Sequence, residues 1–318
     1  MQRPAAVIVL ALAGCGSPPA APGDAAPDDA APAVDAGPCG LRGGPRGLSS
    51  RELAIDGKQR TYLVYLPPAA GPEARLPLVF VHHGYTMSGR KMFDVTEYAA
   101  LADAEGIAVV FPDGQGGPDS TAAPWNVGTG VCPSILGPPP VAAGDDFAFL
   151  DAMTADVAAD QCLDTEHVFV TGFSMGGYFS HHAGCMRPDI RGIAPHSGGT
   201  HVLAGCKSER KPVIIFHGAA DPVIPAGCND PAAPPIAGVT PAADAWAAHN
   251  GCSLATIPSN VNGGTCRRYL GCPDGGQVEL CTFPAMGHCW AGGPGVYGCS
   301  TYAEATRLEW QFWKKFAW

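Results

Sequence analysis

The feature that most constrains how this chain folds is a series of short apolar runs, each bounded by Gly, Pro or Asp. The runs are "TYLVYLP" from 61, "LPLVFVHHG" from 76, "GIAVVFPDG" from 106, "HVFVTG" from 167, "KPVIIFHG" from 211 and "QVELCTF" from 277. Such apolar, β-branched runs are typical of strands buried on both faces. Segments with helical spacing lie between them, at 88–105, 145–161, 175–186, 239–250 and 301–316. The alternation predicts an α/β fold with a mostly parallel central sheet and helices on both faces.

Composition sets the size of the core and narrows the class of partner. The chain has 318 residues, of which 46% are hydrophobic, which is enough to bury a large core. Its net charge is -10. Nucleic acids and anionic membrane surfaces select clustered Lys and Arg, so we expect neither as the main partner.

The first fifteen residues are typical of an export signal. Met1-Gln2-Arg3 supplies a positive charge, "AAVIVLALA" forms an apolar core, and "LAGC" ends at Cys15. The apolar core is too short to span a bilayer. "LAGC" resembles the lipobox of bacterial lipoproteins, which implies cleavage before Cys15 and a lipid anchor on its thiol; the alternative is an ordinary signal peptide with an incidental cysteine. Both interpretations predict an exported protein, either secreted or anchored at the cell envelope. Because Gly16 replaces the Asp of inner-membrane retention, a Gram-negative cell would carry the anchor in its outer membrane.

Residues 16–38 differ sharply in composition from the rest. They consist almost wholly of Ala, Pro, Gly, Asp and Ser, which provide little to bury and too much proline for a helix. We expect a disordered tether here. Neither an internal repeat nor a second linker follows, so residues 39–318 are expected to form a single domain, and we expect a monomer.

Twelve cysteines remain when Cys15 is set aside. Their spacing does not match a structural zinc site, so no metal is expected. An even number of cysteines in an exported protein indicates disulfides. Connectivity does not follow from one sequence, but proximity suggests a pair between Cys289 and Cys299. It also suggests links within a cluster made of Cys252, Cys266, Cys272 and Cys281.

The segment "TGFSMGGY" places one serine among three glycines directly after an apolar run. A glycine enters backbone regions barred to other residues and lets neighbouring chain pass closely. A strand, a sharp turn at Ser174 and a helix from Met175 match the G-x-S-x-G nucleophile elbow. A glycine-rich helix start is the simpler alternative.

A nucleophilic serine needs a base and an acid that orients the base. In an elbow-containing fold these follow in the order Ser, Asp, His, each after a late strand. Asp221 follows the run from 211, and His288 follows the run from 277. We therefore predict a catalytic triad of Ser174, Asp221 and His288, although Asp221 and His288 taken singly are also compatible with ordinary loop positions.

Two backbone N–H groups are expected to bind the developing oxyanion. One belongs to Met175, directly after the nucleophile. The other comes from the loop after the run at 76, where Tyr85 is the first choice and Gly84 the second. His82 and His83 precede this loop, but adjacent side chains on a strand point to opposite faces, which disfavours a metal site.

The combined motifs resemble a known family. "VHHGY", "WNVGTGVC", "GDDFAFL", "GFSMGGY", "FHGAADPVIP" and "GHCWAGG" occur in the order seen in exported esterases of carbohydrate esterase family 1, which groups feruloyl esterases with polyhydroxybutyrate depolymerase-like proteins. The resemblance covers about residues 50–318. It implies an α/β-hydrolase fold, the predicted triad and no cofactor. Two positions depart from the family pattern: His82 replaces a usual leucine, and Cys289 replaces the Thr or Glu that commonly follows the histidine.

The resemblance implies hydrolysis of feruloyl or acetyl esters of plant polysaccharide, or of small aromatic esters. Trp125 and Trp290 are candidate walls of a substrate cleft, unless they pack in the core. Asp145 and Asp146 are expected to cap a helix and brace a loop. The alternatives are a hydrolase of short 3-hydroxyalkanoate polyesters and a non-catalytic surface lipoprotein on the same fold.

Overall fold

The computed structural model describes residues 39, 43–120, 122–128, 144–199, 203, 205–224 and 239–318. By its internal contacts the chain divides into two units, Met1–Asp35 and Ala36–Trp318, and every described residue belongs to the second. The expected signal peptide with Cys15 and the expected tether lie outside the described residues. Among the residues described, no helix is long and apolar enough to cross a membrane.

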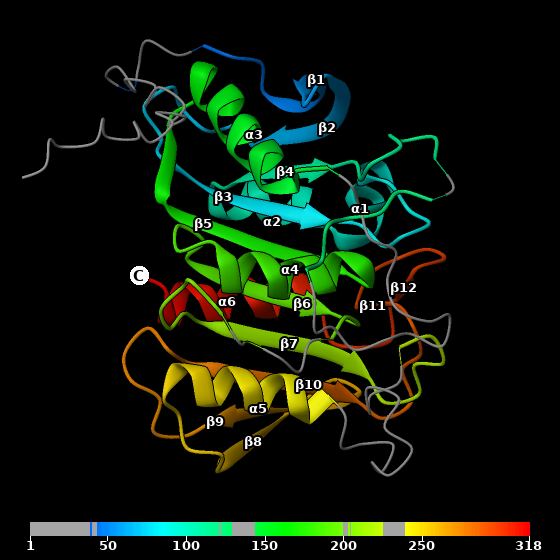
Figure 1. Ribbon diagram of the computed structural model, residues 1–318, viewed down its shortest axis with the longest axis vertical. Coiled ribbons are helices and arrows are strands. Elements are labelled where there is room, and N and C mark those ends of the chain that lie inside the picture. The colour runs from blue at the N-terminus through cyan, green and yellow to red at the C-terminus, as the bar shows by residue number, and fades with distance from the viewer. Residues whose placement is uncertain are drawn as a thin grey trace, which may run out of the picture. The chain divides into compact units, whose positions relative to one another are not determined.

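One large sheet organises the described residues (Figure 1). Its strands are β1 (Gly47–Ile55), β2 (Lys58–Leu66), β3 (Leu76–His82), β4 (Ala108–Pro112), β5 (Leu163–Phe173), β6 (Gly192–His196), β7 (Val213–Gly218), β8 (Thr256–Val261), β9 (Gly264–Tyr269) and β10 (Val278–Phe283). The spatial order is β1-β2-β4-β3-β5-β6-β7-β10-β9-β8. The strands from β4 to β10 in this order are parallel, and antiparallel strands extend the sheet at both ends. The predicted α/β fold with a mostly parallel sheet is confirmed.

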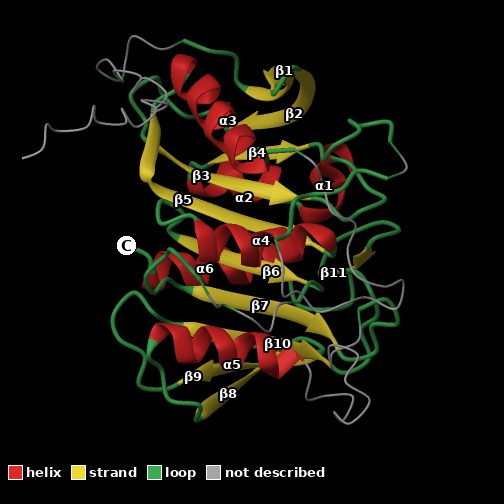
Figure 2. Ribbon diagram, viewed as in Figure 1, coloured by secondary structure: helices red, strands yellow, loops and turns green. Residues whose placement is uncertain are grey.

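Helices cover both faces of the sheet (Figure 2). They are α1 (Gly89–Thr96), α2 (Tyr98–Glu105), α3 (Asp146–Asp160), α4 (Met175–Met186), α5 (Val239–Asn250) and α6 (Ala305–Phe316). One apolar core lies between the sheet and α3, α4 and α5, and a second lies between the opposite face and α1, α2 and α6. The residues of β4, β6 and β7 are all buried, as expected for strands covered on both faces.

The helix expected at 88–105 is two helices. Glu97 has φ 54°, a left-handed conformation that ends α1 and precedes α2. Residues other than glycine seldom adopt this conformation. Because the break falls at a glutamate, the sequence gives no sign of it. At the start of α3, Asp145 Oδ1 accepts the N–H groups of Phe147 and Ala148, which confirms the expected cap.

Five disulfides join described cysteines: Cys39–Cys162, Cys185–Cys206, Cys252–Cys272, Cys266–Cys281 and Cys289–Cys299. The pair suggested for Cys289 and Cys299 is confirmed, and the cluster of four resolves into two bridges. The bridge from Cys289 encloses two short strands, β11 (Trp290–Ala291) and β12 (Gly298–Cys299), directly after His288. The loop that follows this histidine is therefore closed covalently.

Candidate active site

Ser174 lies in a sharp turn at the carboxyl end of a central strand. Strand β5 ends at Phe173 and helix α4 begins at Met175, so Ser174 alone makes the connection. Its backbone has φ 56° and ψ -114°, and its N–H donates to the carbonyl of His196 at 2.8 Å. This is the strand, turn and helix expected of a nucleophile elbow.

The glycines around Ser174 let neighbouring backbones approach closely. A Cβ atom at Gly176 would lie 2.2 Å from the His82 carbonyl oxygen. A Cβ atom at Gly172 would lie 2.5 Å from the carbonyl oxygen of Gly176, and one at Gly177 would lie 2.5 Å from that of His196. None of the three has a positive φ, whereas Ser174 does. Of the two reasons for glycine, close approach is therefore the one that applies, and the strained conformation belongs to the serine.

The structure brings Asp221 and His288 into contact, although 67 residues separate them in sequence. Nδ1 of His288 lies 2.7 Å from Oδ2 of Asp221. The other carboxylate oxygen, Oδ1, accepts the N–H groups of Val223 and Ile224 at 2.8 and 2.9 Å. The carboxylate is thus held at one oxygen by the backbone and presents the other to the imidazole.

The Asp221 carboxylate is buried and remains ionised. Burial opposes ionisation, but the hydrogen bond and charge of His288 outweigh it, and the pKa of Asp221 falls below its ordinary value. A carboxylate facing Nδ1 holds the proton on that nitrogen, so Nε2 of His288 is available to accept a proton.

His288 lies beside the elbow. Its ring centroid is 4.6 Å from that of Phe173, the residue before Ser174. In the described part of the chain, no hydrogen bond joins Ser174 Oγ and His288. Such bonds are often long in unliganded enzymes and tighten when substrate binds.

The loop after β3 is fixed by hydrogen bonds to successive carbonyl groups. Nε2 of His83 accepts the N–H of Gly114 at 2.8 Å, so its Nδ1 carries the proton and donates to the Gly84 carbonyl at 2.7 Å. Burial lowers the pKa of His83 to about 4, which keeps the ring neutral. The Tyr85 carbonyl accepts from Ala123 N–H at 2.9 Å.

This arrangement leaves two N–H groups beside the elbow. In a trans peptide the N–H of Tyr85 points opposite to the Gly84 carbonyl, which His83 holds. Within the described residues, neither Tyr85 N–H nor Met175 N–H has an acceptor. A Cβ atom at Gly84 would lie 3.1 Å from Cβ of Ser174, so this loop packs directly against the serine. The geometry is compatible with the expected pair of donors.

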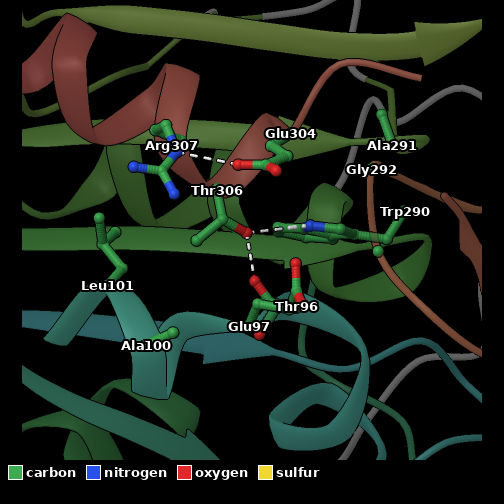
Figure 3. A pocket seen from close by; sticks show the side chains of 11 residues that line it. Thr96, Glu97, Ala100, Leu101, Trp290, Ala291, Gly292, Glu304, Thr306 and Arg307 are labelled. Atoms are coloured by element: carbon green, nitrogen blue, oxygen red, sulfur yellow. Dashed lines mark hydrogen bonds and ion pairs between the residues drawn. The ribbon is translucent and has the colours of Figure 1, made fainter. Parts of the chain in front are cut away.

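Trp125 and Trp290, expected as cleft walls, are both buried with 1% of their surface exposed. The indole N–H of Trp125 donates to the His83 carbonyl at 2.9 Å. Trp290 stacks on His196 with 3.6 Å between centroids and donates to Thr306 Oγ1 at 3.1 Å. Its edge borders a cavity of about 180 Å³ between the α1–α2 region and the start of α6 (Figure 3). This corrects the expectation: both rings pack in the core, where Trp125 braces the loop at His83.

Sequence reasoning missed several polar residues that surround the site. His217 approaches Asp221, and His196 contacts Glu309 at 3.2 Å beneath the elbow. Arg60 was also missed; it pairs with Asp146, whose Oδ2 accepts the N–H of Asn126, as expected of a residue that braces a loop. The partners of His196 and Arg60 are distant in the chain, whereas His217 lies only four positions before Asp221.

One cluster of potential metal ligands occurs among the described residues. Cys266, Glu279 and Cys281 lie close together. Both cysteines belong to one disulfide, so neither supplies a thiolate. His82 and His83 do not form a pair of ligands either, because His83 uses both ring nitrogens in hydrogen bonds.

Comparison with known proteins places the chain in a family. The family model described as "Esterase PHB depolymerase" matches residues 60–224, more than half of the chain. The chain belongs to this family. The family model covers β2 to the turn after Asp221, and so includes Ser174. The resemblance inferred from the motifs is confirmed.

Two curated relatives extend the likeness of this Esterase PHB depolymerase member. Feruloyl esterase B from Piromyces equi is 29% identical over 81% of the chain, and the chain spans 45% of that protein. Feruloyl esterase C from Emericella nidulans is 29% identical over 80% of the chain, which spans 83% of it. Acetyl xylan esterase from Aspergillus awamori has the same fold, with a TM-score of 0.54, 15% identity and coverage of 76% of this chain and 94% of that one.

Proposed function

We propose that the protein is a serine-dependent carboxylic ester hydrolase that acts through an acyl-enzyme, with Ser174, His288 and Asp221 as its triad. The hydrogen bond of 2.7 Å between His288 and the buried Asp221 carries this proposal, because it joins a base and an orienting acid beside an elbow serine. Membership of an esterase family supports the same chemistry.

In the proposed mechanism, Nε2 of His288 takes the proton of Ser174 as Oγ attacks the ester carbonyl. Asp221 stabilises the imidazolium without taking its proton. The N–H groups of Tyr85 and Met175 bind the oxyanion, with Gly84 N–H as the alternative to Tyr85. The alcohol leaves with the proton from His288. Water, deprotonated by His288, then releases the acid and restores Ser174.

The proposed substrates are feruloyl or acetyl esters of plant polysaccharide, or small aromatic esters, because the two relatives compared above are named feruloyl esterases. A second candidate is the hydrolysis of short 3-hydroxyalkanoate polyesters, which the description of the matching family favours. No cofactor takes part in the proposed steps.

We also propose that the protein acts outside the cytoplasm, secreted or anchored by lipid on Cys15. The five disulfides support an oxidising compartment. Metabolic labelling with a radioactive fatty acid tests the anchor: the wild-type chain incorporates label and Cys15→Ser does not. If the exported wild-type chain incorporates no label, the ordinary signal peptide is the correct interpretation.

The experiment that tests the activity compares the oxidised protein with Ser174→Ala on p-nitrophenyl acetate, methyl ferulate and 3-hydroxybutyrate oligomers. We expect the wild type to hydrolyse methyl ferulate and the variant to lose about a million-fold in kcat. Turnover of the oligomers but not of methyl ferulate favours the polyester candidate. If the folded wild type hydrolyses none of these esters and does not react with a fluorophosphonate, the result favours the non-catalytic lipoprotein.

A further inference from the structure

A second histidine, His217, lies next to the acid of the proposed triad. It is the penultimate residue of β7, four positions before Asp221, and only 2% of its surface is exposed. Its Nε2 lies 2.9 Å from the Ile224 carbonyl oxygen and 3.8 Å from Oδ2 of Asp221, the oxygen that faces His288.

The tautomer of His217 follows from its partner. A carbonyl oxygen only accepts, so Nε2 must carry the proton that it donates to Ile224. Burial lowers the pKa of His217, although the negative charge of Asp221 opposes this, so the ring is neutral. Nδ1 is then a lone-pair acceptor, and it has no hydrogen-bond partner in the described residues. Burying an unpartnered acceptor is unfavourable, which makes packing alone a poor reason for a histidine here.

His217 holds the turn that holds Asp221. Ile224 donates its N–H to Oδ1 of Asp221 and accepts from His217 with its carbonyl oxygen. The backbone N–H of Ile224 is therefore fixed by Asp221, and its carbonyl group is fixed by His217. The titratable groups facing His217 are Asp221 and His288. A neutral ring supplies an N–H near the carboxylate without competing as a full positive charge for the interaction with His288.

We propose that His217 is a positioning residue for the proposed triad. Its Nε2–H fixes the Asp221–Ile224 turn, so that Oδ1 stays on the backbone N–H groups and Oδ2 stays on Nδ1 of His288. This inference rests on the proposed function for its effect on activity, but the contact between Asp221 and His288 is measurable without activity.

Three substitutions separate the donor from the bulk of the ring. His217→Gln places an amide N–H where Nε2 lies, His217→Asn places its amide nearer the position of Nδ1, and His217→Leu removes all polarity. His181→Gln is the matched control, because His181 is a neutral histidine with 1% exposure that accepts the indole N–H of Trp246 at 2.8 Å and does not contact the triad.

Two readouts are measured on the oxidised full chain. The first is kcat and KM with p-nitrophenyl acetate. We expect His217→Leu and His217→Asn to lose about ten- to a hundred-fold in kcat with KM unchanged within about two-fold, and His217→Gln to recover most of the loss. The second is the low-field proton resonance of the His288 Nδ1–H. We expect it in the wild type and His217→Gln, and its loss in His217→Asn.

Equal effects of His217→Gln and His217→Asn on both readouts would overturn the proposal. It would also be overturned if His217→Leu were less stable but kept the wild-type kcat and the resonance. If His217→Leu does not fold, the comparison of the two amides still decides. If the wild type has no esterase activity but shows the resonance, and His217→Asn lacks it, the proposed function is contradicted while the positioning role of His217 stands.

Discussion

At the scale of single residues, the site depends on groups that are held in unfavourable surroundings. Ser174 occupies a backbone conformation with φ 56°, and Asp221 keeps its charge in a buried position. Such features persist only where the surrounding structure determines them. Here the hydrogen bond from Ser174 N–H to His196 and the three N–H partners of Asp221 provide that determination.

Asp221→Asn is expected to lower kcat by about ten-thousand-fold. An amide N–H facing His288 would favour the wrong tautomer, with the proton on Nε2, which could no longer accept the Ser174 proton. Steady-state kinetics on p-nitrophenyl acetate check this, with Asp244→Asn as control because, among the described residues, the Asp244 side chain bonds only Tyr269. Retention of more than a tenth of wild-type kcat by Asp221→Asn would exclude Asp221 as the acid.

Lys211 predicts a pH dependence of stability. Its Nζ donates to the carbonyls of Arg187 and Ile190, and burial lowers its pKa to about 7. The unfolded chain therefore binds more protons than the folded one between about pH 7 and pH 10. Through Lys211, the free energy of unfolding rises with pH across this window, by at most about 1.4 kcal/mol per pH unit.

Urea unfolding of the wild type and Lys211→Met at several pH values in that window measures the effect. The free-energy difference, wild type minus variant, should increase with pH, because the variant lacks the titrating group. A difference independent of pH would show that the ammonium form is retained in the fold.

The residues of the proposed triad could be chosen from the sequence because each follows an apolar strand, where a parallel sheet gathers its loops. The residues around them could not be chosen in this way. Trp125 and Trp290 are next to the motifs in sequence, but a sequence does not show whether an aromatic ring faces a cleft or the core. His217 was missed because its partner, the Ile224 carbonyl, carries no side-chain signal.

At the scale of elements, α6 is joined to the sheet by a buried carboxyl group. Glu309 contacts Tyr98, Thr171 and His196 and has no exposed surface. Thr171 Oγ1 lies 2.6 Å from the Ala194 carbonyl and 2.9 Å from Glu309 Oε2, and its single proton can serve only one of them. Glu309 therefore supplies the second proton as a neutral acid, in agreement with the effect of burial, which raises its pKa well above the ordinary value.

Glu309→Gln should change the free energy of unfolding by less than about 1 kcal/mol, because an amide donates and accepts in the same places. Glu309→Leu should cost about 3 kcal/mol or more, because it leaves buried hydroxyl groups unpaired. Denaturant unfolding of both variants checks this. A large loss for Gln equal to that for Leu would indicate an ionised carboxylate instead.

Elements were predictable where the sequence has a continuous apolar run or helical spacing, and were missed where it has neither. The helices at 175–186 and 239–250 match α4 and α5. Strand β8, "TIPSNV", is mostly exposed at the sheet edge, so it lacks the burial pattern that identifies a strand. Strand β6 is only "GIAPH", too short for periodicity to detect.

At the scale of the whole domain, the disulfides constrain loops of very different length. Cys39–Cys162 spans 123 positions, whereas Cys289–Cys299 spans 10. In the chain-entropy view the first contributes about 5 kcal/mol to stability and the second about 3 kcal/mol.

Replacing Cys39 and Cys162 together by serine should therefore lower the unfolding free energy more than replacing Cys289 and Cys299. The second pair should lower kcat more, because Cys289 is adjacent to His288. Unfolding and steady-state kinetics of the two double variants, measured side by side, test the separation. The reverse order of the two kinetic losses would contradict it.

The closed loop after His288 also has a consequence for when the protein works. In a reducing compartment such as the cytoplasm, Cys289 and Cys299 would be thiols, and no disulfide would hold the loop that follows His288. We expect hydrolysis to begin only after oxidation. Steady-state kinetics of the reduced and oxidised forms of one preparation would measure the difference in kcat. Activation by oxidation would spare the cell's own esters during synthesis.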